Sequence, residues 1–450
     1  MTPAPPKVGC GVVGAATPCG AIAEGEGPIG IVAGGGRLPL LLAESLAARG
    51  RGVHIVGLGD EADAGIARYR HTRVRWGEVG RMLQALRRAG CREVVIAGTV
   101  RRPDLWQLRP DAGLLAALPR VLGLLAGGDD HVLTRVVAFF ENAGFRVLGA
   151  DQVAPELLSP AGRIGGPDLD GQARRDAALG FAVRRALRRI DTGQAVVVAG
   201  GRVLAIEGVE GTDAMLRRLA AGRGSELRSG VLAKGPKPGQ ELRVDMPAIG
   251  PRTIANARAA GLAAVVVEAG AVLLLDAAHT LHVAAAERCA VHGLPVDAAP
   301  AAPAAAGGPR ALQLIGINRP TRRDRRDLEY GLAAVEALNA VGEHGAALVA
   351  RAHVLAIEPG DWGPATLARV SALRQWGLGG SGRSGVLVGQ PPACDRETVA
   401  DVLGRAAAQR LAGVALLGPA QLTEPFARAV RLADSLKLFL LVCAERTQGP

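Results

Sequence analysis

The sequence predicts an α/β protein, in which a domain with a parallel sheet is followed by two related α/β domains. Short apolar runs alternate with helical segments from residue 29 onward, a pattern typical of parallel strands joined by crossover helices. The chain has 450 residues, 49% of them hydrophobic, which is enough for roughly two to four domains with buried cores. Its last third repeats features of its middle third, which indicates an internal duplication.

The first domain is expected to alternate strands and helices. Expected strands occupy residues 29–33, 53–56, 93–97 and 145–148, and expected helices end at residues 49 and 89. Gly34, Gly35 and Gly36 follow the first strand, and Pro39 suits the first turn of the next helix. This succession predicts a Rossmann-like domain that binds ligands at the carboxyl edge of its sheet.

The second domain is expected to contain a helix at 172–189, a hairpin of strands 195–199 and 203–206, and strands at 230–233 and 241–244. Its motifs recur 151 to 155 residues later. Val-Leu-Ala-Ile-Glu occupies 203–207 and 354–358, and Arg-Ser-Gly-Val-Leu occupies 228–232 and 383–387. In the repeat, Gly389 stands in place of Lys234, and the counterpart of the Asp245 segment is shortened.

Segments rich in Pro, Gly and Ala therefore divide the chain into five parts. These are a disordered N-terminal extension (1–27), the Rossmann-like domain (28–155), a second α/β domain (156–295), an Ala/Pro-rich linker (296–310) and a degenerate second copy of the α/β domain (311–447).

Composition narrows the classes of partner. The net charge of +11 favours anionic ligands or surfaces. Nucleic acid is not expected, because the basic residues are spread along helices and only 3% of residues are aromatic and able to stack on bases. The six cysteines have no paired spacing, which indicates a reducing compartment and no disulfide framework.

No membrane span is expected. The longest apolar stretch, 260–278, is interrupted by Glu268 and Asp276 and is better explained by two buried strands. Residues 1–27 lack the basic start and continuous apolar core of a signal peptide. Contact with a membrane would then be peripheral.

Lysine is rare in this chain, and its distribution is uneven. Of 53 basic residues only four are lysines, and two of these, Lys234 and Lys237, lie in a Pro/Gly-rich loop that precedes Asp245. Lysine is a compact point charge, which arginine does not replace at a tight anionic site. A solvated basic loop is the alternative. A carboxylate flanked by lysines suits hydrolysis of a phosphoanhydride, since Asp245 can bind Mg²⁺ or orient a water while the lysines neutralise phosphoryl oxygens.

Two further groups are candidates for binding the ligand. Gly34, Gly35 and Gly36 could cradle a phosphate at a helix start, or could simply form a tight turn. Thr99 and Arg101 follow the strand 93–97, at the same edge of the sheet. Pro39 occupies the place of the last glycine in a dinucleotide fingerprint, which argues against an oxidoreductase.

Glu210, Thr212 and Asp213 follow the strand 203–206 and open a helix. All three are candidate substrate-binding residues. Thr212 is expected to cap the helix, and the acidic groups could also hold a metal or sugar hydroxyls. His279, His282, Cys289 and His292 have ligand-like spacing, but they are spread too far along one helix and its end to favour zinc.

With these residues in view, positions 29–294 resemble the LpxI-type UDP-2,3-diacylglucosamine pyrophosphatases of lipid A biosynthesis. Five motifs carry the resemblance in the family's order: Ile-Val-Ala-Gly-Gly-Gly-Arg-Leu-Pro (31–39), Ala-Gly-Thr-Val-Arg-Arg-Pro (97–103), Gly-Asp-Asp (128–130), Glu-Gly-Thr-Asp-Ala-Met (210–215) and the stretch 230–250.

The resemblance implies an Mg²⁺-dependent hydrolase. Water would attack the α-phosphorus of UDP-2,3-diacylglucosamine and release UMP and 2,3-diacylglucosamine 1-phosphate (lipid X). Residues 28–155 would bind the nucleotide, and residues 156–295 would be the catalytic domain. The family's Val-Asp-(Leu/Met)-Pro motif places the catalytic aspartate at Asp245, and Lys234 and Lys237 match its lysine-rich loop. The enzyme would work in the cytoplasm, peripheral to the inner membrane.

Similar proteins end near residue 294, so the degenerate copy is a departure from the family. We expect it to stand in for a partner subunit, giving a pseudo-dimer, although a homo-oligomer is also compatible with the sequence. The alternative to an enzyme is a non-catalytic protein that binds a nucleotide sugar or a lipid.

Overall fold

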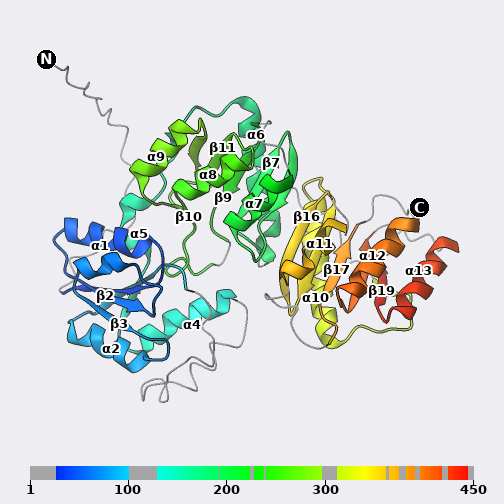
Figure 1. Ribbon diagram of the computed structural model, residues 1–450, viewed down its shortest axis with the longest axis horizontal. Helices are drawn as coiled ribbons and strands as arrows, with labels where there is room; N and C mark the ends of the chain where they lie inside the picture. Colours follow the sequence, from blue (N-terminus) through cyan, green and yellow to red (C-terminus); the bar gives the residue numbers. More distant parts are fainter. Residues whose placement is uncertain are drawn as a thin grey trace, which may run out of the picture.

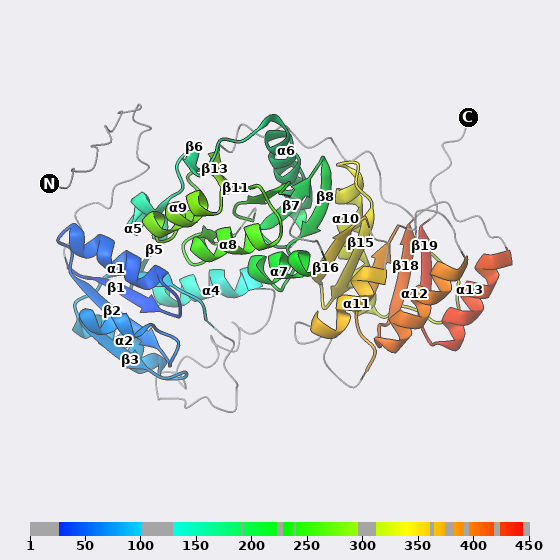
Figure 2. The same cartoon turned by 45° about the horizontal axis from the view of Figure 1, so that its top comes forward.

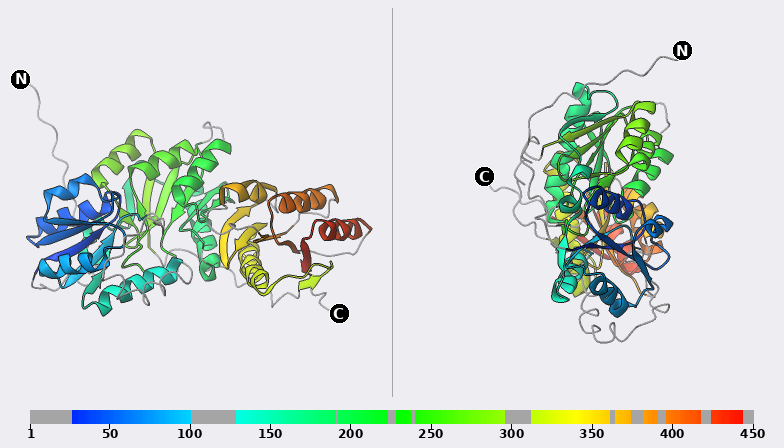
Figure 3. Two further views of the ribbon diagram at one scale, coloured as in Figure 1. Left: turned by 60° about the horizontal axis from the view of Figure 1, so that its bottom comes forward. Right: turned by 90° about the vertical axis from the view of Figure 1, so that its left-hand side faces the viewer.

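The computed structural model describes residues 27–100, 129–190, 192–222, 228–237, 240–295, 312–360, 364–373, 382–390, 396–417 and 424–443. Three α/β units follow one another along the long axis of the molecule, in chain order (Figure 1). The left view of Figure 3 shows the same linear order from another direction. Apart from Gly27, the expected extension 1–27 lies outside the described residues, as does the whole linker 296–310.

The first unit is built on a five-stranded sheet in which every pairing is parallel, as the sequence predicts. Its order is β3-β2-β1-β4-β5, so the chain reverses its direction of winding between β1 and β4. The elements are β1 (Ile29–Ala33), α1 (Leu38–Ala48), β2 (Val53–Leu58), β3 (His71–Val74), α2 (Val79–Arg88), β4 (Glu93–Ala97), α4 (Asp129–Asn142), β5 (Arg146–Leu148) and α5 (Ala150–Val153). Strand β3 was not predicted from the sequence, because this edge strand is mostly polar and pairs on one side only.

The second unit has a six-stranded sheet of order β6-β13-β11-β9-β7-β8. Its strands are β6 (Gly162–Gly165), β7 (Ala195–Ala199), β8 (Arg202–Ile206), β9 (Val231–Lys234), β11 (Ala264–Glu268) and β13 (Ala290–Leu294). Its helices are α6 (Gly171–Ala186), α7 (Thr212–Gly222), α8 (Pro251–Ala259) and α9 (Ala277–Ala286). Strands β9, β11 and β13 are parallel, and β7 and β8 form the expected hairpin.

A small two-stranded sheet accompanies the second unit. It joins β10 (Ala248–Ile249) to β12 (Leu273–Leu274). The apolar stretch 260–278 thus contains strands β11 and β12, as expected. No helix among the described residues is both long enough and apolar enough to span a bilayer.

The expected strand at 241–244 is wrong, because residues 242–244 form a turn. The backbone carbonyl of Glu241 accepts hydrogen bonds from the amides of Val244 (3.1 Å) and Asp245 (3.0 Å). The Glu241 carboxylate also pairs with Arg243 at 2.8 Å. These local bonds satisfy the backbone groups that a strand would need for its ladder.

The third unit has strands β14 (Leu312–Leu314), β15 (Gly345–Ala350), β16 (His353–Pro359), β17 (Val386–Gly389), β18 (Gly413–Leu417) and β19 (Phe439–Cys443). Its helices are α10 (Arg322–Asn339), α11 (Pro364–Leu373), α12 (Arg396–Ala408) and α13 (Glu424–Ser435). The sheet order β14-β19-β18-β17-β15-β16 matches that of the second unit strand for strand, with the same parallel and antiparallel pairings.

The second and third units also share a turn-stabilising contact. Asp176 on α6 accepts hydrogen bonds from the amides of residues 200 and 201 in the β7–β8 turn, at 3.0 and 2.8 Å. Asp327 on α10 does the same for residues 351 and 352 in the β15–β16 turn, at 3.1 and 2.6 Å. All four turn residues have positive φ, the backbone that a two-residue hairpin turn of type I′ requires.

The three units contact one another through their cores. Strands β8 and β16 lie side by side (Figure 2), and one apolar cluster joins Val198 and Val203 of the second unit to Val349 and Val354 of the third. Towards the first unit, Leu273 packs with Leu40 and Leu148.

Candidate functional site

The candidate site lies at the edge of the second sheet where β8 and β9 end and β7 starts. Lys234, the last residue of β9, pairs with Ala195, the first residue of β7. Glu207 directly follows β8, and its amide donates to the Ala195 carbonyl at 2.9 Å. The strand register therefore brings Lys234 and Glu207 to one edge of the sheet.

A threonine joins the lysine to the glutamate. The Lys234 ammonium donates to Thr212 Oγ1 at 3.0 Å, and the Thr212 hydroxyl donates to Glu207 Oε2 at 2.7 Å. All three side chains are buried. Thr212 is the first residue of α7, and its hydroxyl serves this network instead of the helix cap expected from the sequence.

Burial shifts both charged groups of the network. It lowers the pKa of the Lys234 ammonium and raises the pKa of the Glu207 carboxyl, because each charge loses its hydration. The carboxylates of Glu207, Asp213 and Asp245 oppose the shift at Lys234, while the cationic Arg184 adds to it. Removing one partner of such a buried pair typically costs about 3–5 kcal/mol, so the geometry is strongly specified.

The lysine loop and Asp245 are connected by Gln240, a buried residue. Its side chain accepts a hydrogen bond from the Lys237 amide at 2.9 Å and donates to Asp245 Oδ2. Sequence reasoning missed this residue, because an isolated glutamine in a Pro/Gly-rich loop carries no distinguishing pattern. Asp245 itself is half-buried.

Arg184 on α6 fixes the start of the same loop. It donates to the carbonyl of Pro236 at 2.6 Å and pairs with Glu268 Oε2 at 3.4 Å. Its guanidinium carbon lies 5.4 Å from the centre of the Phe181 ring. The sequence does not set Arg184 apart from the other basic residues of the helices, whereas in the structure it is a second buried cation near Lys234.

The triglycine turn of the first unit is tied to β4. The Gly34 amide donates to the Ala97 carbonyl at 2.9 Å, and Gly35 and Thr99 exchange two backbone bonds of 2.7 and 2.8 Å. A Cβ atom on Gly34 would lie 2.5 Å from the Thr99 carbonyl oxygen. Gly34 and Gly35 thus serve a tight turn, while contact of Gly34, Gly35, Gly36 and Thr99 with substrate stays a prediction. Arg101 lies outside the described residues.

The remaining predicted residues separate into two environments. Asp213 accepts from Asn256 at 3.0 Å and pairs with Arg252 at 2.8 Å. The Glu210 carboxylate faces the third unit, where it pairs with Arg369 at 2.5 Å. The structure therefore brings Lys234 together with Thr212, Asp213 and Asp245. It directs Glu210 away from them.

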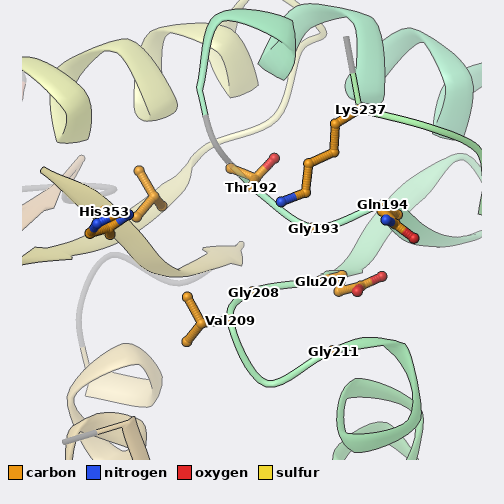
Figure 4. A pocket seen from close by; sticks show the side chains of 10 residues that line it. Thr192, Gly193, Gln194, Glu207, Gly208, Val209, Gly211, Lys237 and His353 are labelled. Carbon is orange, nitrogen blue, oxygen red and sulfur yellow. The ribbon is translucent and has the colours of Figure 1, made fainter. Parts of the chain in front are cut away.

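A cavity of about 200 Å³ opens beside this network. The second unit contributes Glu207 and Lys237 to its wall, and β16 of the third unit contributes His353 and Val354. In Figure 4 the Lys237 side chain extends across the cavity, with His353 on the opposite side. The cavity is thus bounded by the second and third units of the chain.

The donor groups fit Mg²⁺ in its usual mode, in which one or two carboxylates act together with waters and substrate phosphates. Asp245 provides such a carboxylate beside the lysines. Within the described residues, no three His, Cys, Asp or Glu side chains form a metal cage, so the alternative zinc site finds no support there.

Two family models match the first and second units of the chain. The family model described as LpxI N-terminal domain matches residues 28–157, and the model described as LpxI C-terminal domain matches residues 160–292. The chain is 47% identical over 255 residues to a protein of Caulobacter vibrioides named UDP-2,3-diacylglucosamine pyrophosphatase LpxI, an alignment that covers 55% of this chain and 90% of the relative.

A solved murein peptide ligase from Psychrobacter arcticus aligns with 93% of this chain and 91% of its own. It shares 11% identity at a TM-score of 0.19, which is too low to support any conclusion.

Proposed function

The chain belongs to the LpxI family, and we propose that it hydrolyses the pyrophosphate bond of UDP-2,3-diacylglucosamine in lipid A biosynthesis. Water adds to the α-phosphorus, and the bond from that phosphorus to the bridging oxygen breaks. The bridging oxygen leaves with the β-phosphate, so the products are UMP and 2,3-diacylglucosamine 1-phosphate (lipid X).

The observation that carries this proposal is the buried network of Lys234, Thr212 and Glu207 beside Asp245. A lysine whose ammonium is fixed by a hydrogen bond can face the phosphoryl oxygens without reorganising during the reaction. Asp245 is proposed as the residue that holds Mg²⁺ or orients the attacking water. Gln240 keeps that carboxylate in place.

Mg²⁺ is part of the proposal. When bound, it would polarise the phosphoryl oxygens and neutralise part of their charge. Asp245 would hold the ion, and Lys234 and Lys237 would bind the remaining phosphate charge. The test is release of UMP from UDP-2,3-diacylglucosamine by the full chain. We expect release with Mg²⁺, loss on chelation and recovery when Mg²⁺ is added back. Undiminished release in the chelator would contradict the metal requirement.

We also propose that the substrate lies between the first and second units, with the Rossmann-like unit binding the nucleotide. The carboxyl ends of β1 and β4, where the winding of the sheet reverses, are the usual ligand position in such a sheet. Gly36, Thr99 and Arg101 would contact the substrate from this side, and Asp213 from the other.

The third unit is proposed to be a degenerate second copy of the catalytic unit. The identical strand order supports this, as does the register, in which Gly389 pairs with Ala346 just as Lys234 pairs with Ala195. Sixteen residues separate β9 from α8, but only six separate β17 from α12. The copy therefore has no room for a segment like the one that carries Lys237 and Asp245, and we propose that it replaces a partner subunit.

The lipid tails and the basic surface are proposed to bring the enzyme to the cytoplasmic face of the inner membrane. Basic side chains near an anionic bilayer attract the protein electrostatically, and inserted acyl chains add to that attraction.

A further inference from the structure

The loop 208–211 lies between two members of the buried network, because it joins Glu207 to Thr212. Its outer side lies against the third unit. The Val209 amide donates to the Leu355 carbonyl on β16 at 3.4 Å, and a Cβ atom on Gly208 would lie 2.5 Å from that carbonyl oxygen. The loop therefore has little freedom to move while the third unit is in place.

A cluster of two arginines and two glutamates fixes the same loop more tightly. Arg369 on α11 pairs with Glu210 at 2.5 Å and also with Glu358. Arg218 on α7 pairs with both glutamates at 3.4 Å. The side chains of Arg369, Glu210 and Glu358 are 11%, 14% and 9% exposed. Charges this well buried hold one geometry, because any displacement leaves a desolvated charge unpaired.

Glu210 stands two residues before Thr212, and the intervening Gly211 has a φ of +82°. The Gly211 amide donates to the Gly208 carbonyl at 3.3 Å, which closes the loop on itself. Because the loop is short and closed, a displacement of Glu210 also displaces the Thr212 hydroxyl, which contacts Lys234 and Glu207.

We propose that Arg369 is a positioning residue for the hydrolysis: through Glu210 and the loop 208–211 it places Thr212 and hence Lys234. The third unit is then needed for catalysis even though Gly389 replaces the lysine in its own sheet. The cavity supports the same conclusion, because His353 and Val354 of the third unit form part of the wall beside Glu207. This inference rests on the proposed hydrolysis.

The test uses the full chain and follows UMP release with Mg²⁺. Arg369→Gln removes the charge from the cluster, and we expect kcat to fall about tenfold, since small displacements of a positioned group reduce rates by such factors. KM should stay within about twofold, because Arg369 acts on Lys234 from outside the substrate site. Arg369→Lys keeps the charge and should recover part of kcat. The control is Arg405→Gln, which breaks an exposed pair with Asp401 on α12 and should leave kcat unchanged.

A double-mutant cycle separates positioning from general destabilisation. If Arg369 acts through Glu210, the combination Arg369→Gln with Glu210→Gln should lower kcat no more than the stronger single variant. Strictly additive losses would overturn the inference while leaving the hydrolysis intact. Wild-type kcat in a folded Arg369→Gln protein, or in a folded Glu210→Gln protein, would overturn it in the same way. A wild type that releases no UMP would instead contradict the proposed function, and the inference with it.

Discussion

The Lys234 ammonium donates a hydrogen bond to the Thr212 hydroxyl at 3.0 Å, in an environment where both side chains are buried. Thr212 comes from the start of a helix and Lys234 from the end of a strand, 22 residues apart. The hydroxyl in turn donates a hydrogen bond to Glu207, so one oxygen connects a buried cation to a buried carboxylate.

Replacing Thr212 by valine is expected to damage both stability and activity. Valine keeps the shape but leaves Lys234 and Glu207 without their common partner, which should cost about 1–3 kcal/mol of unfolding free energy. UMP release should fall about tenfold or more, because the ammonium is no longer held in position. Denaturant unfolding and initial rates measure the two effects.

The control for that variant is Thr280→Val. Thr280 is also buried and donates to the Leu275 carbonyl at 2.7 Å, but it lies on α9. It should lose comparable stability while kcat stays near the wild-type value. If Thr212→Val kept full activity, Lys234 would not depend on this hydroxyl.

The stability of the protein should fall as the pH drops below about 6.5, in part because of His292. Burial lowers the pKa of this imidazole, so the unfolded chain binds a proton at a higher pH than the folded protein does. The contribution of neutral His292 to the unfolding free energy is fully present above pH 6.5, and it is lost as the pH falls towards the pKa of the folded state. His292→Gln should reduce this slope, measured by denaturant unfolding between pH 7 and 5.

His279→Gln is the matched control for His292, because His279 is exposed on α9. Its pH dependence should resemble that of the wild type. An identical slope in His292→Gln and wild type would show that His292 does not contribute to the acid sensitivity.

Gly34→Ala should destabilise the first unit. The added Cβ would lie 2.5 Å from the Thr99 carbonyl oxygen, and backbone at that distance cannot yield without moving the edge of the sheet. We expect a loss of about 1–3 kcal/mol of unfolding free energy and a raised KM, since the substrate is proposed to bind at this edge. Equilibrium unfolding and steady-state kinetics measure these effects.

For comparison, Gly404→Ala adds a methyl group within α12, where, apart from the surrounding turns of the helix itself, the described residues place no atom within 4 Å of it. It should be neutral or stabilising by up to about 1 kcal/mol, as expected for alanine in a helix. Equal stability of the two variants would mean that the turn of Gly34 tolerates a side chain.

The sequence predicted the main architecture because buried parallel strands are nearly continuous apolar runs. Strands such as β1 and β11 have this pattern. Strands β3 and β6 do not, since they are polar or glycine-rich edge strands whose pairing depends on neighbours distant in sequence. The turn at 242–244 was predicted as a strand because polar and apolar residues alternate there. The backbone hydrogen bonds that make it a turn leave no such pattern in the sequence.

The candidate site was predictable only in part. The rarity of lysine pointed to Lys234. The sequence does not show which way Glu207 and Glu210 face, whereas the fold turns one towards Lys234 and the other towards Arg369. Gln240 became visible only through its two hydrogen bonds. The role of a residue that depends on contacts between distant segments can be recognised only in the three-dimensional structure.

The most direct test of the central claim is the rate of UMP release from UDP-2,3-diacylglucosamine by Asp245→Asn, with Mg²⁺ present. The substitution keeps the size of the side chain and removes its charge, so we expect the rate to fall about a thousandfold or more, with unfolding free energy within about 1 kcal/mol of the wild type. Asp401→Asn, which alters an exposed pair on α12, should keep the wild-type rate. A wild-type rate in Asp245→Asn, or tight binding of substrate by the wild type without any release of UMP, would contradict the account.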